Sequence, residues 1–301
     1  MTPNRPMLSP ADLQRRSLLI QAVRNFFFDR QYIEVDTPIR LPVLIPEAEI
    51  LPLSSEDHFL QTSPELCMKR LLAGGCSRLF QICPCFRKGE RGRLHQEEFT
   101  MLEWYRTGWS YLELMKECEE MIRQVAGRET ILCSGREIAL AGPWQRLTVN
   151  DAFICYAGVS AHEAVRTGRF DELLVGKVEP HLGWQTPIFL YDYPVALASL
   201  AQPKQDAPEL AERFELYIAG IELANGFSEL TDPVVQHRRF CEEIAKASTR
   251  NRTCQLPEKF LAALEHLPEC AGIALGLDRL FMLLLGRDCI ADVRPFRDME
   301  L

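Results

Sequence analysis

The sequence predicts an α+β fold, because hairpins with strand periodicity alternate with segments of helical periodicity along the 301-residue chain. The first hairpin spans residues 83–105, where two strands flank a polar loop that contains glycine. The second joins strands at 214–218 and 221–224 through a two-residue Ala-Gly turn. Helices are predicted at 10–30 and 112–125, where apolar residues recur at helical spacing.

Composition limits the classes of protein that the chain can belong to. Hydrophobic residues make up 47% and charged residues 25%, as in ordinary globular proteins, and the length suits one large domain or two modest ones. Because no run of about eighteen apolar residues occurs, no membrane span is expected. The N-terminus lacks the apolar core of a signal peptide, so the sequence predicts a cytoplasmic protein.

The charge distribution disfavours non-specific binding of nucleic acid. The net charge is −8, and no tract is rich in Lys and Arg. A local basic patch, made of Arg87, Lys88, Arg91 and Arg93, lies in the loop of the first hairpin, where phosphates are expected to bind. An acidic surface elsewhere would suit a basic protein partner.

The eleven cysteines give little sign of a metal site. They are odd in number, spread along the chain and without a CxxC pair, whereas zinc sites use close pairs. Cys76, Cys83 and Cys85 form the one cluster. The sequence therefore predicts reduced thiols that pack as small hydrophobic side chains.

The first helix and the segment after it are predicted from capping and proline signals. Ser9 caps the helix, Pro10 takes its first position, and an apolar stripe continues to about residue 30. A strand at 32–38 ends at proline, and loops with short strands are expected over 39–62.

A second helix is predicted to begin at Ser63-Pro64-Glu65 and to end at Gly74-Gly75. Serine, proline and an early acid are ordinary signals of a helix start. A carboxylate at a helix start beside the first hairpin could equally receive the amine of a substrate. Both interpretations of Glu65 stay open at this point.

The second strand of the first hairpin carries the clearest candidate site. Its period of two places Phe99, Glu103 and Tyr105 on one face, and Arg87 begins the adjoining loop. An aromatic ring can stack on a base, an arginine can bind phosphate, and a carboxylate can bind an amine. The pattern predicts a site for a nucleotide and an amine, although an amphipathic strand with one wet face shows the same alternation.

The second hairpin brings acids together. With a two-residue turn, Tyr217 lies opposite Glu222, and Glu215 lies diagonally beside Glu222 on the same face. Two such carboxylates can hold the Mg²⁺ carried by a triphosphate, whereas on a solvent-facing strand pair they would only repel each other. Asn225-Gly226 is then expected to bend the chain.

The middle of the chain is less informative. Over 130–190, strands are predicted near Ile131 and Ile188 and a short helix at 149–156. No repeat or low-complexity segment occurs.

Near the C-terminus, an apolar strand from residue 270 meets Gly276, and a helix is predicted at 278–285. Arg279 lies in the first turn of this helix, where the helix dipole favours acids. A cation in that position is explained if it and the helix start both face an anion. An ordinary surface arginine is the alternative.

In this order, the segments resemble the three signature motifs of the class II aminoacyl-tRNA synthetases. Residues 9–38 resemble the first motif, which forms the dimer interface in that family. Phe86-Arg87 through Glu103 resembles the second, and residues 276–279 resemble the third. The resemblance implies the catalytic core of the family, a mixed and mostly antiparallel sheet flanked by helices.

Within the class, residues 98–101 and 225–230 are similar to the lysyl-tRNA synthetases. Those enzymes carry an anticodon-reading barrel before the first motif, which here begins near residue 9, so one catalytic domain over 1–301 is expected. Ala274 stands where they have glycine. A core without the barrel resembles their paralogues that modify elongation factor P, as do residues 61–65, 101–105, 198–202 and 220–225.

This resemblance implies a ligase reaction. ATP and a lysine-type amino acid, (R)-β-lysine in these paralogues, form an aminoacyl-adenylate and pyrophosphate. The acyl group then passes to the ε-amine of a lysine on elongation factor P. A homodimer, a Mg²⁺ cofactor and no role for tRNA are also implied; the alternatives are a tRNA-charging enzyme and a non-catalytic regulator built on a synthetase core.

The resemblance also implies residue roles. Glu65 would receive the backbone-type amine of the substrate, and Glu103, Tyr105 and Glu229 its distal ammonium. Catalysis would rest on Arg87 and Arg279, and Mg²⁺ binding on Glu215 and Glu222. The ATP-binding residues expected are Arg87, Lys88, Gly89, Gln96, Phe99, Glu222, Leu223, Gly276 and Arg279. The substrate-binding residues expected are Ser63, Pro64, Glu65, Glu103, Tyr105, Asn225, Glu229 and Ala274.

Two positions depart from the family pattern. The acid that usually stands two residues after the arginine of the second motif is replaced by Gly89, so either Glu90 takes over its contact or the contact is lost. Gln96 stands where the family has asparagine. Because neither change touches Arg87 or Arg279, ATP binding is still expected.

Overall fold

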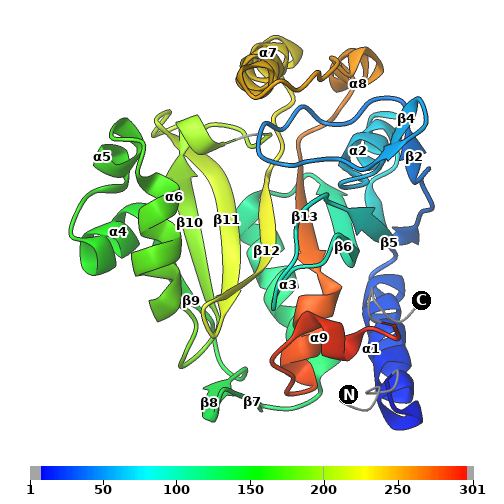
Figure 1. The fold of residues 1–301 in the computed structure, drawn as a ribbon, viewed down its shortest axis with the longest axis vertical. Coiled ribbons are helices and arrows are strands. Elements are labelled where there is room, and N and C mark those ends of the chain that lie inside the picture. Colours follow the sequence, from blue (N-terminus) through cyan, green and yellow to red (C-terminus); the bar gives the residue numbers. More distant parts are fainter. Residues whose placement is uncertain (1–7, 199, 297–301) are drawn as a thin grey trace.

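An eight-stranded sheet forms the centre of the computed structural model, which describes residues 8–198 and 200–296 (Figure 1). In spatial order its strands are β1 (Ile33–Glu34), β5 (Arg78–Phe86), β6 (Glu98–Thr107), β13 (Cys270–Gly276), β12 (Ile221–Ser228), β11 (Leu210–Ile218), β10 (Ile188–Pro194) and β9 (Gln145–Thr148). Neighbours from β5 to β10 pair antiparallel, and the two edge strands pair in parallel. The predicted mixed, mostly antiparallel sheet is confirmed.

Helices cover this sheet, and two small sheets lie beside it. The helices are α1 (Pro10–Asp29), α2 (Glu65–Ala73), α3 (Tyr111–Ala126), α4 (Val149–Ala157), α5 (Ala161–Arg166), α6 (Phe170–Leu173), α7 (Pro233–Thr249), α8 (Glu258–Leu264) and α9 (Leu277–Leu284), with shorter helical turns at Leu174–Val178, Glu179–His181, Val195–Leu197 and Ile290–Val293. The small sheets contain β2 (Arg40–Leu41), β4 (His58–Leu60) and β3 (Ser54–Ser55), and β7 (Thr130–Cys133) and β8 (Arg136–Ala139).

Alternation along β6 separates the hydrophobic core from the candidate site. Leu102 and Trp104 are fully buried in a cluster with residues of α1, α3 and α9. Phe99, Met101 and Glu103 face the other side, because successive residues of a strand point to opposite faces. This other face is covered near Tyr105 by residues of α2, α7 and α8.

The predicted helices are confirmed. The hydroxyl of Ser9 accepts a hydrogen bond from the amide of Asp12 at 3.1 Å, which caps α1. The Ser63 hydroxyl accepts one from the amide of Glu65 at 3.0 Å at the start of α2. The predicted helices at 112–125 and 149–156 are α3 and α4. Ser199, which belongs to one of the segments shared with the elongation factor P-modifying paralogues, lies outside the described residues.

Two predictions of local structure are wrong. The strand expected at 32–38 is limited to the two residues of β1, which pair in parallel with β5. Asn225-Gly226 does not bend the chain, because β12 continues through it to Ser228. The glycine serves close packing instead, since a Cβ atom at Gly226 would lie 2.6 Å from the ring of Phe214.

The register of the second hairpin matches the prediction at its turn. Tyr217 pairs with Glu222, but the register shifts between Leu216 and Tyr217, so that Glu215 pairs with Asn225. The Glu215 and Glu222 carboxylates still interact, because Glu215 contributes to a raised pKa of Glu222.

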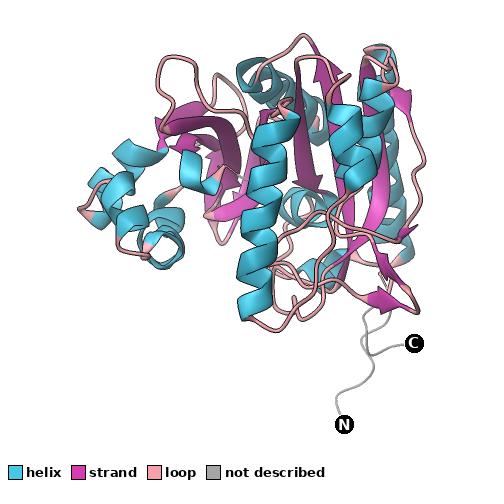
Figure 2. Ribbon diagram, turned by 90° about the horizontal axis from the view of Figure 1, so that it is seen from above, coloured by secondary structure: helices cyan, strands magenta, loops and turns pink. Residues whose placement is uncertain are grey.

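Helices α4, α5 and α6 stand apart from the others beside β10, at the β9 end of the sheet (Figures 1 and 2). Sequence reasoning found only α4 here, because α5 and α6 have six and four residues and therefore carry little helical periodicity. No helix in the described ranges is long and apolar enough to cross a membrane.

Candidate active site

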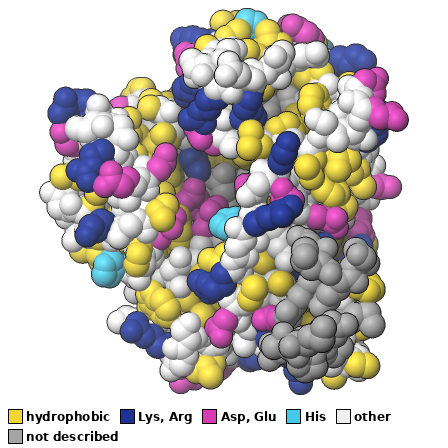
Figure 3. All heavy atoms as spheres, viewed as in Figure 1, with side chains coloured by type: hydrophobic (Ala, Val, Ile, Leu, Met, Phe, Trp, Pro, Cys, Tyr) yellow, Lys and Arg dark blue, Asp and Glu magenta, His cyan; other side chains and the backbone are white. Residues whose placement is uncertain are grey.

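A cavity of about 280 Å³ opens on the face of the sheet that carries Phe99. The space-filling view shows this face hollowed near its centre, with acidic and basic side chains gathered around the hollow (Figure 3). The cavity brings together nine of the residues expected to bind ATP or substrate: Arg87, Gln96, Phe99, Glu222, Leu223, Asn225, Ala274, Gly276 and Arg279.

Arg87 and Phe99 form one wall of the cavity. The guanidinium carbon of Arg87 lies 5.2 Å from the centre of the Phe99 ring. The buried Nε of Arg87 has no hydrogen-bond partner among the described residues, although buried donors are normally paired. Nη1 of Arg87 lies 3.8 Å from Glu90 Oε1. An acid is therefore still close to this arginine, although Gly89 occupies the position where the family usually has one.

Arg279, at the start of α9, lines the same cavity. Its guanidinium donates to the carbonyl oxygens of Leu94 and Glu222 at 3.1 and 2.8 Å, and to Nε2 of His95 at 2.8 Å. Burial and the charge of Arg279 lower the pKa of His95, which keeps that ring neutral and able to accept. The guanidinium is therefore held in place at the cavity wall.

Lys88 and Gly89 lie outside the lining of this cavity. Lys88 lines a neighbouring cavity of about 410 Å³, and its amide donates to the carbonyl of Leu51. Gly89 has a φ of +82°, a conformation that favours glycine, and its amide donates to Glu97 Oε1 at 2.6 Å. Their assignment to ATP binding stays a prediction.

The expected Mg²⁺ ligands differ in how free their oxygens are. Glu215 accepts hydrogen bonds from the phenols of Tyr193 and Tyr217, both at 2.6 Å, and pairs with Arg213 at 2.5 Å. Glu222 lines the cavity, and burial together with the charge of Glu215 raises its pKa to about 7. A bound Mg²⁺ ion would stabilise the ionised form of Glu222, whose oxygens are less engaged than those of Glu215. The pair therefore fits Mg²⁺ mainly through Glu222.

A second group of acids lies beside the cavity and surrounds a buried lysine. Lys69 Nζ lies 2.5 Å from Glu65 Oε1 and also pairs with Glu229 Oε2. Its ammonium lies 5.2 Å from the centre of the Phe227 ring. The other oxygen of Glu229, Oε1, is buried without a hydrogen-bond partner in the part of the chain that the structure describes.

Glu103 completes this amine pocket, which we define as Glu65, Glu103, Glu229 and Lys69. Ser63 and Tyr105 donate to its two oxygens at 2.5 and 2.9 Å. Glu103 pairs across the sheet with Ala274, which lines the cavity, so the pocket and the cavity adjoin. Pro64 lies at the start of α2 and holds no contact of its own in this group.

Burial governs the acids of the amine pocket. It raises the pKa values of Glu103 and Glu229 to about 8, and the charge of Glu65 adds to both shifts. Hydrogen bonds from Ser63 and Tyr105 oppose the shift at Glu103, and Lys69 opposes it at Glu229. An external ammonium would therefore stabilise the ionised form of both acids.

Comparison with known proteins identifies the family. The family model of class II tRNA synthetases (D, K and N) matches residues 6–300. The chain belongs to this family. The predicted class II synthetase fold and the predicted class of activity, an ATP-dependent ligase, are thereby confirmed.

Curated relatives narrow the similarity. A protein of Pectobacterium carotovorum named elongation factor P--(R)-beta-lysine ligase is 39% identical over 97% of this chain and 96% of its own length. A protein of Salmonella gallinarum with the same name is 38% identical over the same shares. The similarity thus extends over nearly the whole of this chain and of each of these two relatives.

Sequence reasoning missed two residues of this class II site. Lys69 was not singled out, because a lysine in a helix normally points to solvent; only its four-residue spacing from Glu65 was a signal. Gly272 in β13 was also missed, although glycine inside a strand often marks a close approach. A Cβ atom there would lie 2.2 Å from the Tyr105 ring and 2.5 Å from Glu229 Oε1.

We therefore expect Gly272→Ala to disturb the amine pocket. The added methyl group would displace Tyr105 or Glu229, and overpacking of this kind costs about 1–3 kcal/mol. Thermal unfolding should show a lower Tm, and the KM for the amino acid should rise. Gly176→Ala is the matched control, because among the described residues no atom outside the backbone of its own helical turn and its chain neighbours lies within 4 Å of its Cβ position. Equal behaviour of the two variants would contradict this role for Gly272.

Proposed function

We propose that the chain activates a lysine-type amino acid, (R)-β-lysine or lysine, as an adenylate and transfers it to the ε-amine of a lysine on elongation factor P. The observation that carries the proposal is that two buried polar atoms lack hydrogen-bond partners, one in the nucleotide cavity and one in the amine pocket. Arg87 lines the nucleotide cavity and its buried Nε has no hydrogen-bond partner among the described residues, and the same holds for the buried Oε1 of Glu229 in the amine pocket. The names of the relatives support the same acceptor.

The cavity suits ATP because an aromatic ring and a guanidinium both line it. The ring of Phe99 would stack on adenine, and Arg279 would bind the triphosphate from the other side. Glu222, with Glu215 behind it, would hold a Mg²⁺ ion that neutralises phosphate charge. Gln96, Leu223 and Gly276 line the rest of the nucleotide site.

Arg87 would bring two anions together. The amino-acid carboxylate attacks the α-phosphorus of ATP, a C–O–P linkage forms, and pyrophosphate leaves with the electrons of the broken P–O bond. Because both reacting groups are anionic, a guanidinium between them lowers the barrier by neutralising charge. Positioning and charge neutralisation suffice for this phosphoryl-type transfer, so no covalent protein nucleophile is required.

The amine pocket suits an amino acid with two ammonium groups. When its three acids are ionised it holds three negative charges and one ammonium, that of Lys69, so two further positive charges balance it. Glu65 would receive the amine near the carboxylate, and Glu103, Tyr105 and Glu229 the distal one. An amino acid without the distal ammonium would leave these buried acids unpaired, which disfavours its binding.

The decisive experiment offers two acceptors together. The purified protein, ATP and labelled (R)-β-lysine are mixed with elongation factor P and lysine tRNA. The expected result is label on a single lysine of elongation factor P, because a chain of net charge −8 is a poor ligand for tRNA. Label on the tRNA would establish the tRNA-charging alternative, and absence of ATP–pyrophosphate exchange with either lysine isomer would establish the regulator.

We also propose a homodimer formed through α1, and a cytoplasmic location. Leu13, Leu18, Phe28 and Ile33 leave between 40% and 56% of their surfaces exposed on or next to this helix. Exposed apolar side chains along one helix favour contact with a second copy. Light scattering of the purified protein, which gives its mass in solution, tests the dimer.

Ala274 should contribute to the choice between α- and β-lysine. Its side chain lines the cavity between Glu103 and Asn225, where the amine would shift by one carbon between the isomers. One methyl group changes discrimination by about 1–3 kcal/mol. We expect Ala274→Gly to shift the ratio of kcat/KM toward α-lysine, measured by pyrophosphate exchange; an unchanged ratio would defeat this assignment.

A further inference from the structure

The nucleotide cavity shares a wall with the neighbouring 410 Å³ cavity. Glu47 and Ile50 line both. The second cavity is lined mainly by apolar side chains, among them Val43, Leu44 and Phe59. Its edge reaches the surface at Lys88 and Leu51, both of which are exposed. A mainly apolar cavity is therefore lined by surface residues and by a carboxylate that also lines the nucleotide site.

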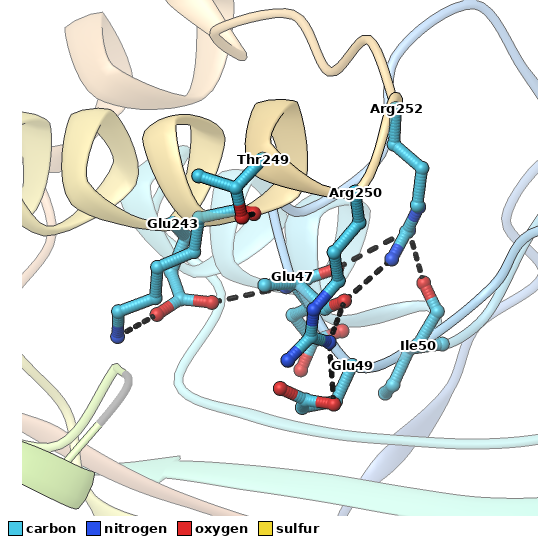
Figure 4. Close-up of polar contacts among 9 residues, drawn as sticks. Glu47, Glu49, Ile50, Glu243, Thr249, Arg250 and Arg252 are labelled. Carbon is cyan, nitrogen blue, oxygen red and sulfur yellow. Dashed lines mark hydrogen bonds and ion pairs between the residues drawn. The ribbon is translucent and has the colours of Figure 1, made fainter.

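The segment that carries Glu47 is held by the end of α7 (Figure 4). Arg252 donates to the carbonyl oxygens of Ala48 and Ile50, both at 2.5 Å. Arg250 also donates to Ala48, at 3.1 Å, and Glu243 accepts from the amide of Ala48 at 3.0 Å. These bonds fix the backbone that follows Glu47, so its position in the wall is set.

The Glu47 carboxylate itself accepts no hydrogen bond from the residues that the structure describes. The charged groups around it come from several elements: Arg87, Arg213, Glu65 and Glu243, with Lys88 and Arg252 in the cavity lining. Arg252 is directed at backbone carbonyls, and Lys88 is exposed to solvent. Glu47 thus lines the cavity, but it has no role in the proposed binding of ATP or of the donor amino acid.

We propose that the apolar cavity admits the side chain of the acceptor lysine and that Glu47 accepts a proton from its ε-ammonium. This inference rests on the proposed function and adds the acceptor site to it. The methylene groups of a lysine suit the apolar lining, and its ammonium suits the carboxylate at the inner end. Arg87, which would hold the adenylate phosphate, lines the same nucleotide cavity as Glu47.

The proton transfer is required by the chemistry. An ammonium has no lone pair, so it must lose one proton before its nitrogen attacks the carbonyl carbon of the adenylate. An N–C bond then forms, the bond from carbon to the phosphate oxygen breaks, and AMP leaves with that electron pair. The second proton of the nitrogen leaves with the phosphate oxygen. Glu47 accepts the first proton and passes it to solvent.

The acidity of Glu47 suits this role. Burial raises its pKa to about 7, with Glu65 and Glu243 adding to the shift and Arg87 opposing it. A general base is most effective when its pKa lies near the working pH, and such groups contribute about 10²–10⁴-fold to a rate.

The test separates the two steps of the reaction. Adenylate formation is measured by pyrophosphate exchange, and transfer by single-turnover labelling of unmodified elongation factor P. For Glu47→Gln, we expect transfer at pH 7 to fall by about 10²-fold more than exchange. The wild-type transfer rate should level off above about pH 7, whereas that of the variant should keep rising toward the pKa of a free lysine, about 10.4.

Two further variants test the site. Glu49→Gln is the matched control, because this acid lies on the same segment with 78% of its side chain exposed, and both steps should stay at the wild-type level. Val43→Trp fills the apolar cavity and should raise the KM for elongation factor P by roughly tenfold, with a smaller effect on exchange.

Equal losses in transfer and exchange for Glu47→Gln would overturn the inference and leave the proposed function standing. So would an unchanged KM for the acceptor in Val43→Trp. A wild-type protein without pyrophosphate exchange would overturn the proposed function, and this inference with it.

Discussion

Arg87→Ala should abolish adenylate formation. The guanidinium lies in the nucleotide cavity with a buried Nε that no described residue engages, so it is available to the two anions that must meet there. Loss of a single preorganised donor of this kind costs about 10²–10³ in rate, and loss of a full charge between two anions costs more. ATP–pyrophosphate exchange with saturating amino acid is the measurement.

Arg166→Ala is the control for that loss. Arg166 lies in α5, pairs with Glu163 at 2.6 Å and leaves 65% of its side chain exposed. Exposed pairs contribute about 0–1 kcal/mol, so exchange should stay close to the wild-type rate. Near-normal exchange by Arg87→Ala, or an equal loss in both variants, would remove Arg87 from the reaction.

Local periodicity explains why much of the site could be predicted. The two-residue period of β6 places Phe99 and Glu103 on one face whatever the rest of the fold does. The turn at Ala219-Gly220 likewise fixes the pairing of Tyr217 with Glu222. Such predictions depend on residues near one another in the sequence.

The predictions fail where contacts between segments far apart in the sequence determine the position of a residue. The register shift that pairs Glu215 with Asn225 leaves no sign in the residues of the hairpin. The burial of Lys69 depends on Glu229, 160 positions away, and on the ring of Phe227. Glu47 is positioned by arginines that follow α7. These contacts join segments across the sheet, and no periodicity of a single segment encodes them.

Glu229→Gln should have the largest effect on binding of the amino acid. The substitution removes one of the three carboxylates of the amine pocket and leaves Lys69 paired with Glu65 alone. The distal ammonium of the substrate would then be buried without its full partner, which costs about 2–5 kcal/mol. The KM for lysine-type substrates should therefore rise by roughly a hundredfold or more in pyrophosphate exchange.

The same acids make binding depend on pH. Glu103 and Glu229, with pKa values of about 8, are largely protonated in the free protein at pH 7, and an arriving ammonium requires them ionised. Binding should therefore release protons at pH 7, and affinity should fall by up to about tenfold per pH unit for each carboxyl as the pH drops below about 8. Calorimetric titration in buffers of different ionisation enthalpy counts the released protons.

Linkage gives the sign of the matching effect on folding. The folded pKa values of Glu103 and Glu229 lie above the ordinary value of 4.5, so their contribution to stability is complete below about pH 4.5 and is lost as the pH rises through about 8. A bound lysine-type amino acid offsets that loss, because its two ammonium groups take the place of the protons on Glu103 and Glu229. The rise in Tm caused by the amino acid should thus grow from pH 6 to pH 9 in the wild type. The rise in Tm should grow less with pH in Glu229→Gln. In Glu265→Gln, which replaces an exposed acid, it should grow as in the wild type. A pH-independent rise would mean that the amino acid binds without displacing protons from these two carboxyls.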